Sequence, residues 1–371
     1  MPPITIMIKP ASGMCNMRCK YCFYADVAAN RELPNYGIMS LSTLEKLMKK
    51  VFSYAEGSAS FIFQGGEPTL AGLDFFGAVL AYQKEYNVNG VKVWNAIQTN
   101  GYAVTEEWAK FFAENNFLVG LSLDGFKEAH DAVRVDSGGR GTYARVVKTA
   151  ALFDACGVEY NILCVVDKMV ARHPVKTYRA LKKYRYLQFI PCMDDFDGKK
   201  QAHSLTAEAY GNFLKQTFDL YYADFIAGTP VSVRTFDNYI GMLMGRRPES
   251  CAMNGVCGQY FLAEADGGIY PCDFYVLDDW CLGNVNTDTF EQMAESERAV
   301  RFLKSSEYVD KKCRNCHWFR LCRGGCRRDR EPFENGRPGL NRYCESYQMF
   351  FEYALPSMRK MALTLAEGRY N

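Results

Sequence analysis

Residues 4–22 read ITIMIKPASGMCNMRCKYC, a stretch that joins a β-rich run to three closely spaced cysteines. Ile4–Ile8 is apolar and rich in β-branched residues, which is the composition of a buried strand. Cys15, Cys19 and Cys22 follow in a short segment that reads as a loop. Because the chemistry of β/α barrels lies on the loops after the strands, this stretch predicts where the functional residues gather.

The β-rich run is the first of a series that alternates with amphipathic runs. Strands are predicted at Ile4–Ile8, Ser60–Phe63, Lys92–Ile97, Leu118–Leu123, Tyr160–Val166 and Tyr186–Ile190. Helices are predicted at Leu41–Ala55, Leu73–Glu85, Thr105–Glu114, Thr142–Ala155 and His173–Lys183, with Ser42-x-x-Glu45 as a capping-box pattern. Such succession favours a parallel sheet with right-handed crossovers. Six strands without a Gly-x-Gly-x-x-Gly turn predict an α/β fold, a partial (β/α)6 TIM-like barrel.

Five of the six loops after these strands carry polar or glycine-rich sequence. The six loops are Cys15–Cys22, Gln64–Pro68, Gln98–Gly101, Ser122–Gly125, Asp167 and Cys192–Met193. Since parallel strands end on the same edge of a sheet, we expect these loops to form one site.

The alternation stops after about residue 204. Leu205–Ile226 predicts a long aromatic helix, and Phe261–Tyr270 predicts a hairpin that turns at Asp266-Gly267-Gly268. The remainder reads as a cysteine-rich, loop-like region until a helix near Ser346–Leu363. We predict two domains, residues 1–230 and 231–371.

Composition narrows the class of protein. A net charge of +2 over 371 residues gives no indication of a nucleic-acid or membrane-surface partner. The first residues lack the pattern of a secretory signal, and no apolar run is long enough to span a membrane, so we expect a cytoplasmic protein. Thiols stay reduced in that compartment, so the 15 cysteines predict metal ligation rather than disulfides. Cys156, Cys164 and Cys192 lie in apolar settings and are expected to be core residues.

The spacing Cys15-x-x-x-Cys19-x-x-Cys22 offers three thiolates in one loop. Three thiolates can hold a 4Fe–4S cluster and leave its fourth iron open for a substrate or cofactor. A structural zinc site, the main alternative, needs four ligands, and this loop contains no histidine.

Together with Gly65-Gly66-Glu67-Pro68, this cysteine pattern resembles the radical S-adenosylmethionine superfamily. The resemblance implies that S-adenosylmethionine binds the open iron and is split to a 5′-deoxyadenosyl radical. It also implies that Gly66 meets the methionyl amine, that Tyr21 contacts the adenine or packs on the cluster, and that three further residues contact S-adenosylmethionine. These are Ser122, Arg134 and Met193, for which a strand-end turn, a solvated charge and a core side chain remain the respective alternatives.

A second group of cysteines near the C-terminus resembles the SPASM extension of radical S-adenosylmethionine enzymes. The resemblance implies two auxiliary 4Fe–4S clusters, three clusters in all. Cys251, Cys257, Cys272 and Cys326 would hold one, and Cys313, Cys316, Cys322 and Cys344 the other, with Cys281 left over. Spacing alone does not pair these ligands, and two zinc-ribbon sites remain an alternative. Fully ligated clusters favour a role in electron transfer.

Several segments are similar to the anaerobic sulfatase-maturating enzymes, among them Ile8–Ser12, Gln64–Gly72, Tyr270–Tyr275 and Trp318–Cys322. This implies oxidation of a Cys or Ser in a sulfatase Cys/Ser-x-Pro/Ala-x-Arg segment to Cα-formylglycine. Asp273 matches the base, with an exposed capping carboxylate as the alternative. Tyr24 and Gln64 are candidates for substrate contacts, whereas His317 is expected to be structural.

The implied partners are an unfolded or nascent sulfatase and an electron donor such as flavodoxin or ferredoxin. Two other hypotheses stay open at this point. One is a related radical enzyme that forms thioether or carbon–carbon crosslinks in a peptide. The other is a non-catalytic electron-transfer or zinc-binding protein, which leaves the Gly-Gly-Glu-Pro loop unexplained. The residues do not distinguish Cys from Ser substrates.

Overall fold

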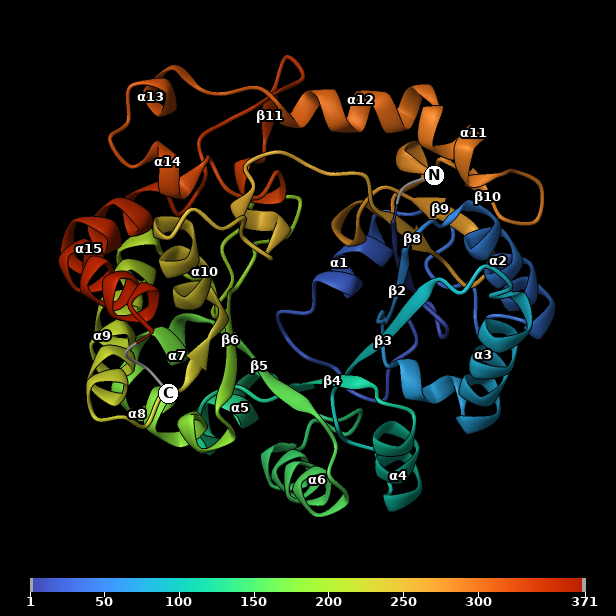
Figure 1. Ribbon diagram of the computed structural model, residues 1–371, viewed down its shortest axis with the longest axis horizontal. Helices are drawn as coiled ribbons and strands as arrows, with labels where there is room; N and C mark the ends of the chain where they lie inside the picture. Colours follow the sequence, from blue (N-terminus) through green and yellow to red (C-terminus); the bar gives the residue numbers. More distant parts are fainter. Residues whose placement is uncertain (1–2, 369–371) are drawn as a thin grey trace. The chain divides into compact units, whose positions relative to one another are not determined.

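The computed structural model describes residues 3–368 (Figure 1). The chain divides into two compact units. The first contains Met1–Ser122, Asp131–Tyr160 and Gln259–Phe302, and the second contains Leu123–His130, Asn161–Gly258 and Leu303–Asn371. Each unit is made of several separate stretches of the chain. The predicted division into two consecutive domains at residue 230 stays a prediction.

In the first unit a mainly parallel sheet begins at the N-terminus. β1 (Ile4–Ile8), β2 (Ser58–Phe63), β3 (Lys92–Thr99) and β4 (Leu118–Ser122) pair in parallel in that order. β1 also pairs in parallel with β8 (Phe261–Ala263), which forms an antiparallel hairpin with β9 (Gly268–Tyr270). β10 (Gly283–Asn284) pairs with β9. The strand β9, which precedes the turn at Asp273, therefore lies in the same sheet as β1 and β2.

Helices cover this sheet because each buries an apolar stripe. They are α1 (Phe23–Ala29), α2 (Leu41–Tyr54), α3 (Leu73–Tyr86), α4 (Glu106–Glu114), α6 (Tyr143–Cys156) and α11 (Phe290–Glu295), with 3₁₀ turns at Pro68–Ala71, Asp273–Tyr275 and Asp278–Trp280. Figure 1 shows α2 and α3 outside β2 and β3. Phe76 packs edge-on against Phe63 and Trp108, with ring centroids 5.0 and 5.4 Å apart. Such aromatic pairs add to the stability that burial provides.

The second unit has its own parallel strands, β5 (Tyr160–Val166), β6 (Tyr186–Pro191) and β7 (Ser232–Val233). Its helices are α7 (Lys168–Arg172), α8 (Pro174–Leu181), α9 (Ala207–Ile226), α10 (Arg234–Leu243), α13 (Lys311–Arg314), α14 (Phe319–Cys322) and α15 (Cys344–Ala366). α15 packs on α9 and α10, where Phe350 stacks on Phe236 with centroids 5.5 Å apart. Shorter elements are 3₁₀ turns at Lys182–Tyr184, Cys251–Met253 and Arg328–Arg330 and the strands β11 (Phe333–Glu334) and β12 (Arg337–Pro338).

All six strands of the predicted β/α series are present, and their ends differ from the prediction by at most two residues. The long aromatic helix and the hairpin at Asp266–Gly268 are also confirmed. The unit boundaries fall inside two helices, α5 (Lys127–Val133) and α12 (Glu297–Ser306). Within residues 3–368 no helix combines the length and the hydropathy needed to cross a membrane.

Two predictions were wrong. Ser42 is not the helix cap: Ser40 has extended backbone and its hydroxyl accepts from the Thr43 N–H at 3.0 Å, so the helix begins at Leu41. The region before the last helix is not loop-like throughout, because α11 and α12 lie within it. The buried Phe290 and Met293 of α11 are three residues apart, as are the buried Ala299 and Phe302 of α12, which is a helical spacing.

We expect truncation of Leu47 in the middle of α2 to destabilise the protein strongly. Leu47 is fully buried, so Leu47→Ala should lower the free energy of unfolding by about 2–5 kcal/mol through lost burial and a residual cavity. Leu41 on the same helix is 50% exposed, and Leu41→Ala should change it by less than about 0.5 kcal/mol. Urea unfolding followed by circular dichroism measures both, and equal losses would contradict the assigned core.

Candidate active site

The loop Cys15–Cys22 is fastened to the segment around residue 134 by backbone hydrogen bonds. The Arg18 N–H donates to the Val135 carbonyl at 2.8 Å, and the Lys20 N–H donates to the Val133 carbonyl at 2.9 Å. α1 begins directly after Cys22. All three cysteines are half-buried and none forms a disulfide, so the loop presents three soft sulfur donors from one short segment.

Glu67 connects this loop to the ends of β2 and β3. Its carboxylate is buried and accepts hydrogen bonds from the Thr69 hydroxyl at 2.7 Å, the Thr99 hydroxyl at 2.8 Å and the Asn100 N–H at 2.8 Å. Burial raises the pKa of Glu67, and these hydrogen bonds oppose that rise. The Asn100 amide in turn lies 3.6 Å from the sulfur of Cys15. The polar loops after β1, β2 and β3 thus meet, as predicted.

The two glycines before Glu67 allow the cysteine loop to approach the backbone closely. A Cβ added to Gly66 would lie 2.0 Å from the Met14 carbonyl oxygen, and Gly65 has a φ of +121°. The Gly66 N–H donates to the Ser12 carbonyl at 3.0 Å, and the Glu67 N–H donates to the Met14 carbonyl at 2.8 Å. Only a residue without a side chain fits this cradle.

All but one of the residues predicted to contact S-adenosylmethionine lie in the first unit. The Arg134 guanidinium lies over the Tyr21 ring, 5.4 Å from its centroid. Arg134 is buried, so the alternative of a solvated charge is wrong. Ser122 ends β4 in the same unit, whereas Met193 follows β6 in the second unit. Their contacts with S-adenosylmethionine stay predictions.

Seven of the C-terminal cysteines lie in the second unit, in two groups. A cavity of about 50 Å³ is lined by four of them, together with Trp318 and Phe319: Cys313, Cys316, Cys322 and Cys344. Burial raises the pKa of the Cys326 thiol, and the neighbouring Cys251 and Cys257 raise it further. Cys272, the predicted fourth member, precedes Asp273 in the first unit. These thiol sets suit iron–sulfur clusters, since thiolates are the usual protein ligands of such clusters.

The remaining cysteines are mixed. Cys164 and Cys192 are buried, as predicted for core residues, whereas Cys156 at the end of α6 is only half-buried. Cys281 is half-buried, and its thiol lies 3.5 Å from the Gly283 carbonyl oxygen. The His317 ring packs edge-on against the Trp318 ring, with the ring centroids 4.7 Å apart. In residues 3–368 no three His, Cys, Asp or Glu side chains are close enough together to hold a single metal ion.

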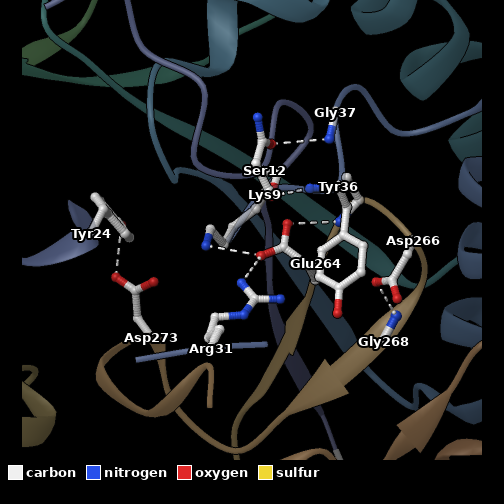
Figure 2. Close-up of polar contacts among 12 residues, drawn as sticks. Lys9, Ser12, Tyr24, Arg31, Tyr36, Gly37, Glu264, Asp266, Gly268 and Asp273 are labelled. Carbon is white, nitrogen blue, oxygen red and sulfur yellow. Dashed lines mark hydrogen bonds and ion pairs between the residues drawn. The ribbon is translucent and has the colours of Figure 1, made fainter. Parts of the chain in front are cut away.

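Asp273 lies in the turn after β9 and points toward α1 (Figure 2). Its Oδ2 accepts from the Tyr24 hydroxyl at 2.7 Å and from the Gln64 amide nitrogen at 3.1 Å. Its Oδ1 is buried and has no hydrogen-bond partner among the described residues. Asp273 is 7% exposed, so the alternative of an exposed capping carboxylate is wrong. Burial raises the pKa of Asp273 to about 6, against the opposing effects of the Lys9 charge and the Tyr24 hydrogen bond.

Sequence reasoning missed three charged residues beside Asp273. Lys9 and Arg31 both donate to the Glu264 carboxylate, at 3.0 and 2.9 Å, and all three side chains are buried (Figure 2). Each of two charged residues directly follows a predicted strand, Lys9 after Ile8 and Glu264 after Ala263. Because charged side chains are mostly exposed, this position alone did not indicate that they would be buried and paired.

Comparison with known proteins gives the same picture along the whole chain. The model of the radical SAM superfamily matches residues 10–181, and SPASM, an iron–sulfur cluster-binding domain, matches residues 255–317. A cysteine-type anaerobic sulfatase-maturating enzyme of Clostridium novyi (strain NT) is 46% identical over 371 residues, covering 99% of each chain. A serine-type enzyme of Bacteroides thetaiotaomicron is 32% identical over 378 residues, covering 96% of this chain and 90% of that one.

A solved structure described as native anSMEcpe with bound AdoMet and Cp18Cys peptide superposes with a TM-score of 0.94. It is 45% identical and covers 98% of this chain and 100% of its own. The predicted α/β fold class with a C-terminal SPASM domain is confirmed, and S-adenosylmethionine and iron–sulfur clusters are the cofactors. Because similarity at this level runs along almost the entire chain, the protein belongs to the anaerobic sulfatase-maturating enzymes, the radical S-adenosylmethionine enzymes that generate formylglycine.

Proposed function

We propose that this enzyme oxidises the cysteine of a sulfatase Cys-x-Pro/Ala-x-Arg segment, with Asp273 as the base that takes the thiol proton. The observation that carries the assignment is the buried Oδ1 of Asp273, an acceptor without a donor among residues 3–368. A buried acceptor left unpaired is costly, and a substrate S–H would satisfy it. Preference for cysteine over serine is supported by the higher identity to cysteine-type relatives, 46% against 32%.

We further propose three 4Fe–4S clusters. Cys15, Cys19 and Cys22 would hold the cluster with the open iron, with Gly66, Tyr21, Ser122, Arg134 and Met193 around S-adenosylmethionine. Cys313, Cys316, Cys322 and Cys344 would hold the second cluster, which is supported by the cavity that they line. Cys251, Cys257 and Cys326 would hold the third together with Cys272.

The chain's own residues prepare the carboxylate for its task. When bound, S-adenosylmethionine and the clusters supply hydrogen-atom abstraction from the substrate Cβ and acceptance of one further electron. The Tyr24 hydroxyl and the Gln64 amide both bind Oδ2, so they orient the carboxylate and leave Oδ1 without a donor. Oδ1 takes the thiol proton. The cysteine thereby loses two hydrogens and becomes a thioaldehyde, which water converts to the aldehyde with release of hydrogen sulfide.

The depth of the base indicates the state of the substrate. A side chain in a folded sulfatase could not reach a carboxylate that is 7% exposed, whereas an extended segment could. We therefore propose an unfolded or nascent sulfatase as the partner. The electron donor would be a flavodoxin or ferredoxin in the cytoplasm, where the cluster thiols stay reduced.

Anaerobic reconstitution with a sulfatase-motif peptide, S-adenosylmethionine and a strong reductant tests this function. Conversion of the cysteine to formylglycine lowers the peptide mass by about 18 Da. A loss of only two hydrogens would instead indicate crosslinking, the alternative left open by the sequence. The same peptide with serine in place of cysteine measures the preference between the two.

We expect Asp273→Asn to retain the clusters and lose most of its activity. The amide has the same shape but cannot take the thiol proton, so formylglycine formation should fall by about 10²–10⁴-fold. Iron content should match the wild type, because Asp273 is not one of the proposed cluster ligands. Asp279→Asn, on an exposed residue of the same unit, is the control and should keep full activity. Full activity of Asp273→Asn would exclude Asp273 as the base.

We expect Gly66→Ala to lose the N-terminal cluster. The added Cβ would collide with the Met14 backbone at 2.0 Å and push the cysteine loop away. Reconstituted protein should lack about one third of its iron, the share of one cluster in three, and should not bind S-adenosylmethionine. Gly77 on α3 has no atom within 4 Å of an added Cβ, so Gly77→Ala should keep full iron content. Normal iron and cofactor binding in Gly66→Ala would contradict the need for this close approach.

A further inference from the structure

Four ionisable side chains are buried together in the first unit. Lys9, Arg31, Glu264 and Asp273 are 2%, 7%, 0% and 7% exposed (Figure 2). They come from the end of β1, the loop after α1, the end of β8 and the turn after β9. Two are cations and two are anions, so their formal charges cancel when all four are ionised. Buried charges are tolerated when they are paired in this way.

Glu264 is the centre of the group, and both of its oxygens are engaged. Oε2 accepts from the Lys9 ammonium at 3.0 Å and from the Arg31 guanidinium at 2.9 Å, while Oε1 accepts from the Ala265 N–H at 2.9 Å. Burial opposes ionisation, but Lys9 and these hydrogen bonds hold the pKa of Glu264 below its ordinary value. Glu264 is therefore an anion, and both of its oxygens already accept hydrogen bonds from other groups.

Lys9 lies between Glu264 and the base. Its ammonium sits 5.3 Å from the centroid of the Tyr24 ring, and the Tyr24 hydroxyl binds Asp273. No hydrogen bond joins the Lys9 ammonium to Asp273 among the described residues. An ammonium has three N–H donors, and Glu264 accepts only one of those on Lys9. Unused donors thus lie near an unused acceptor, the Oδ1 of Asp273.

We propose that Glu264 is a positioning residue for the reaction: it holds the Lys9 ammonium away from Asp273, so that Oδ1 stays open for the substrate proton. The proposal rests on the proposed role of Asp273. A direct ion pair between Lys9 and Asp273 would occupy Oδ1 and block the proton's destination. In a buried setting the attraction between such charges is strong, so a competing carboxylate is needed to prevent that pairing.

The kinetic test uses charge balance among the four side chains. Glu264→Gln removes one anion, which leaves an excess positive charge and frees Lys9 to pair with Asp273. We expect kcat to fall about tenfold or more while KM changes by less than about threefold, since the loss affects the chemical step and not peptide binding. The double variant Lys9→Met/Glu264→Gln balances Arg31 against Asp273, and kcat should return to within about threefold of the wild type.

A merely structural role of Glu264 gives the opposite pattern. The double variant then loses further packing and should be at least as impaired as Glu264→Gln alone, and that result would overturn the proposal. If Glu264→Gln does not fold, the double variant decides: near-wild-type kcat supports the proposal, and a loss of about tenfold or more refutes it. Glu106→Gln is the control, because its ion pair with Lys110 is exposed.

The closing experiment does not depend on activity. A crystal structure of Glu264→Gln should show the Lys9 ammonium within about 3 Å of Asp273 Oδ1. An ammonium that stays on the introduced amide would overturn the inference, even if Asp273→Asn proves inactive. Conversely, full activity of Asp273→Asn would remove the proposed base while the position of Lys9 remained a separate result. The two failures are therefore distinguishable.

Discussion

The buried carboxylate of Glu67 is the constraint on which the rest of the N-terminal site depends. Its oxygens accept from the loops after β2 and β3, and Asn100 carries that connection to the sulfur of Cys15. Without this carboxylate, the buried donors of the two loops would have no acceptor. Each unpaired donor would lower the stability of the fold by about 1–3 kcal/mol. The glycines before it let the cysteine loop pack on the same backbone. The loop that carries Cys15, Cys19 and Cys22 is thereby tied by hydrogen bonds to the ends of two strands.

The substrate side uses buried charge in a different way. Glu67 has its lone pairs filled by uncharged donors, whereas Asp273 keeps one oxygen without a partner and lies beside a lysine. Glu264 separates these two opposite charges. Both carboxylates are buried, but one stabilises the fold and the other is left available for a reactant.

Sequence patterns predicted the fold class well, because it depends on local features. Strand and helix runs follow from hydrophobic periodicity, and ligand spacing within a loop is visible in the chain. The failures came where neighbours decide the outcome. Ser40 rather than Ser42 caps α2, because backbone conformation selects the cap. The sequence also left a solvated Arg134 open as an alternative, and only its burial against Tyr21 excluded it.

The sequence by itself determined the order of β-strands and helices, the three-thiolate loop and the position of Asp273 next to Cys272. Only the tertiary structure decided what surrounds that carboxylate. Lys9 and Glu264 are 255 residues apart, and they meet because β1 pairs with β8. Tyr24, 249 residues before Asp273, reaches it through the same arrangement. Burial and charge pairing depend on groups that are distant in the chain, so no local sequence pattern predicts them.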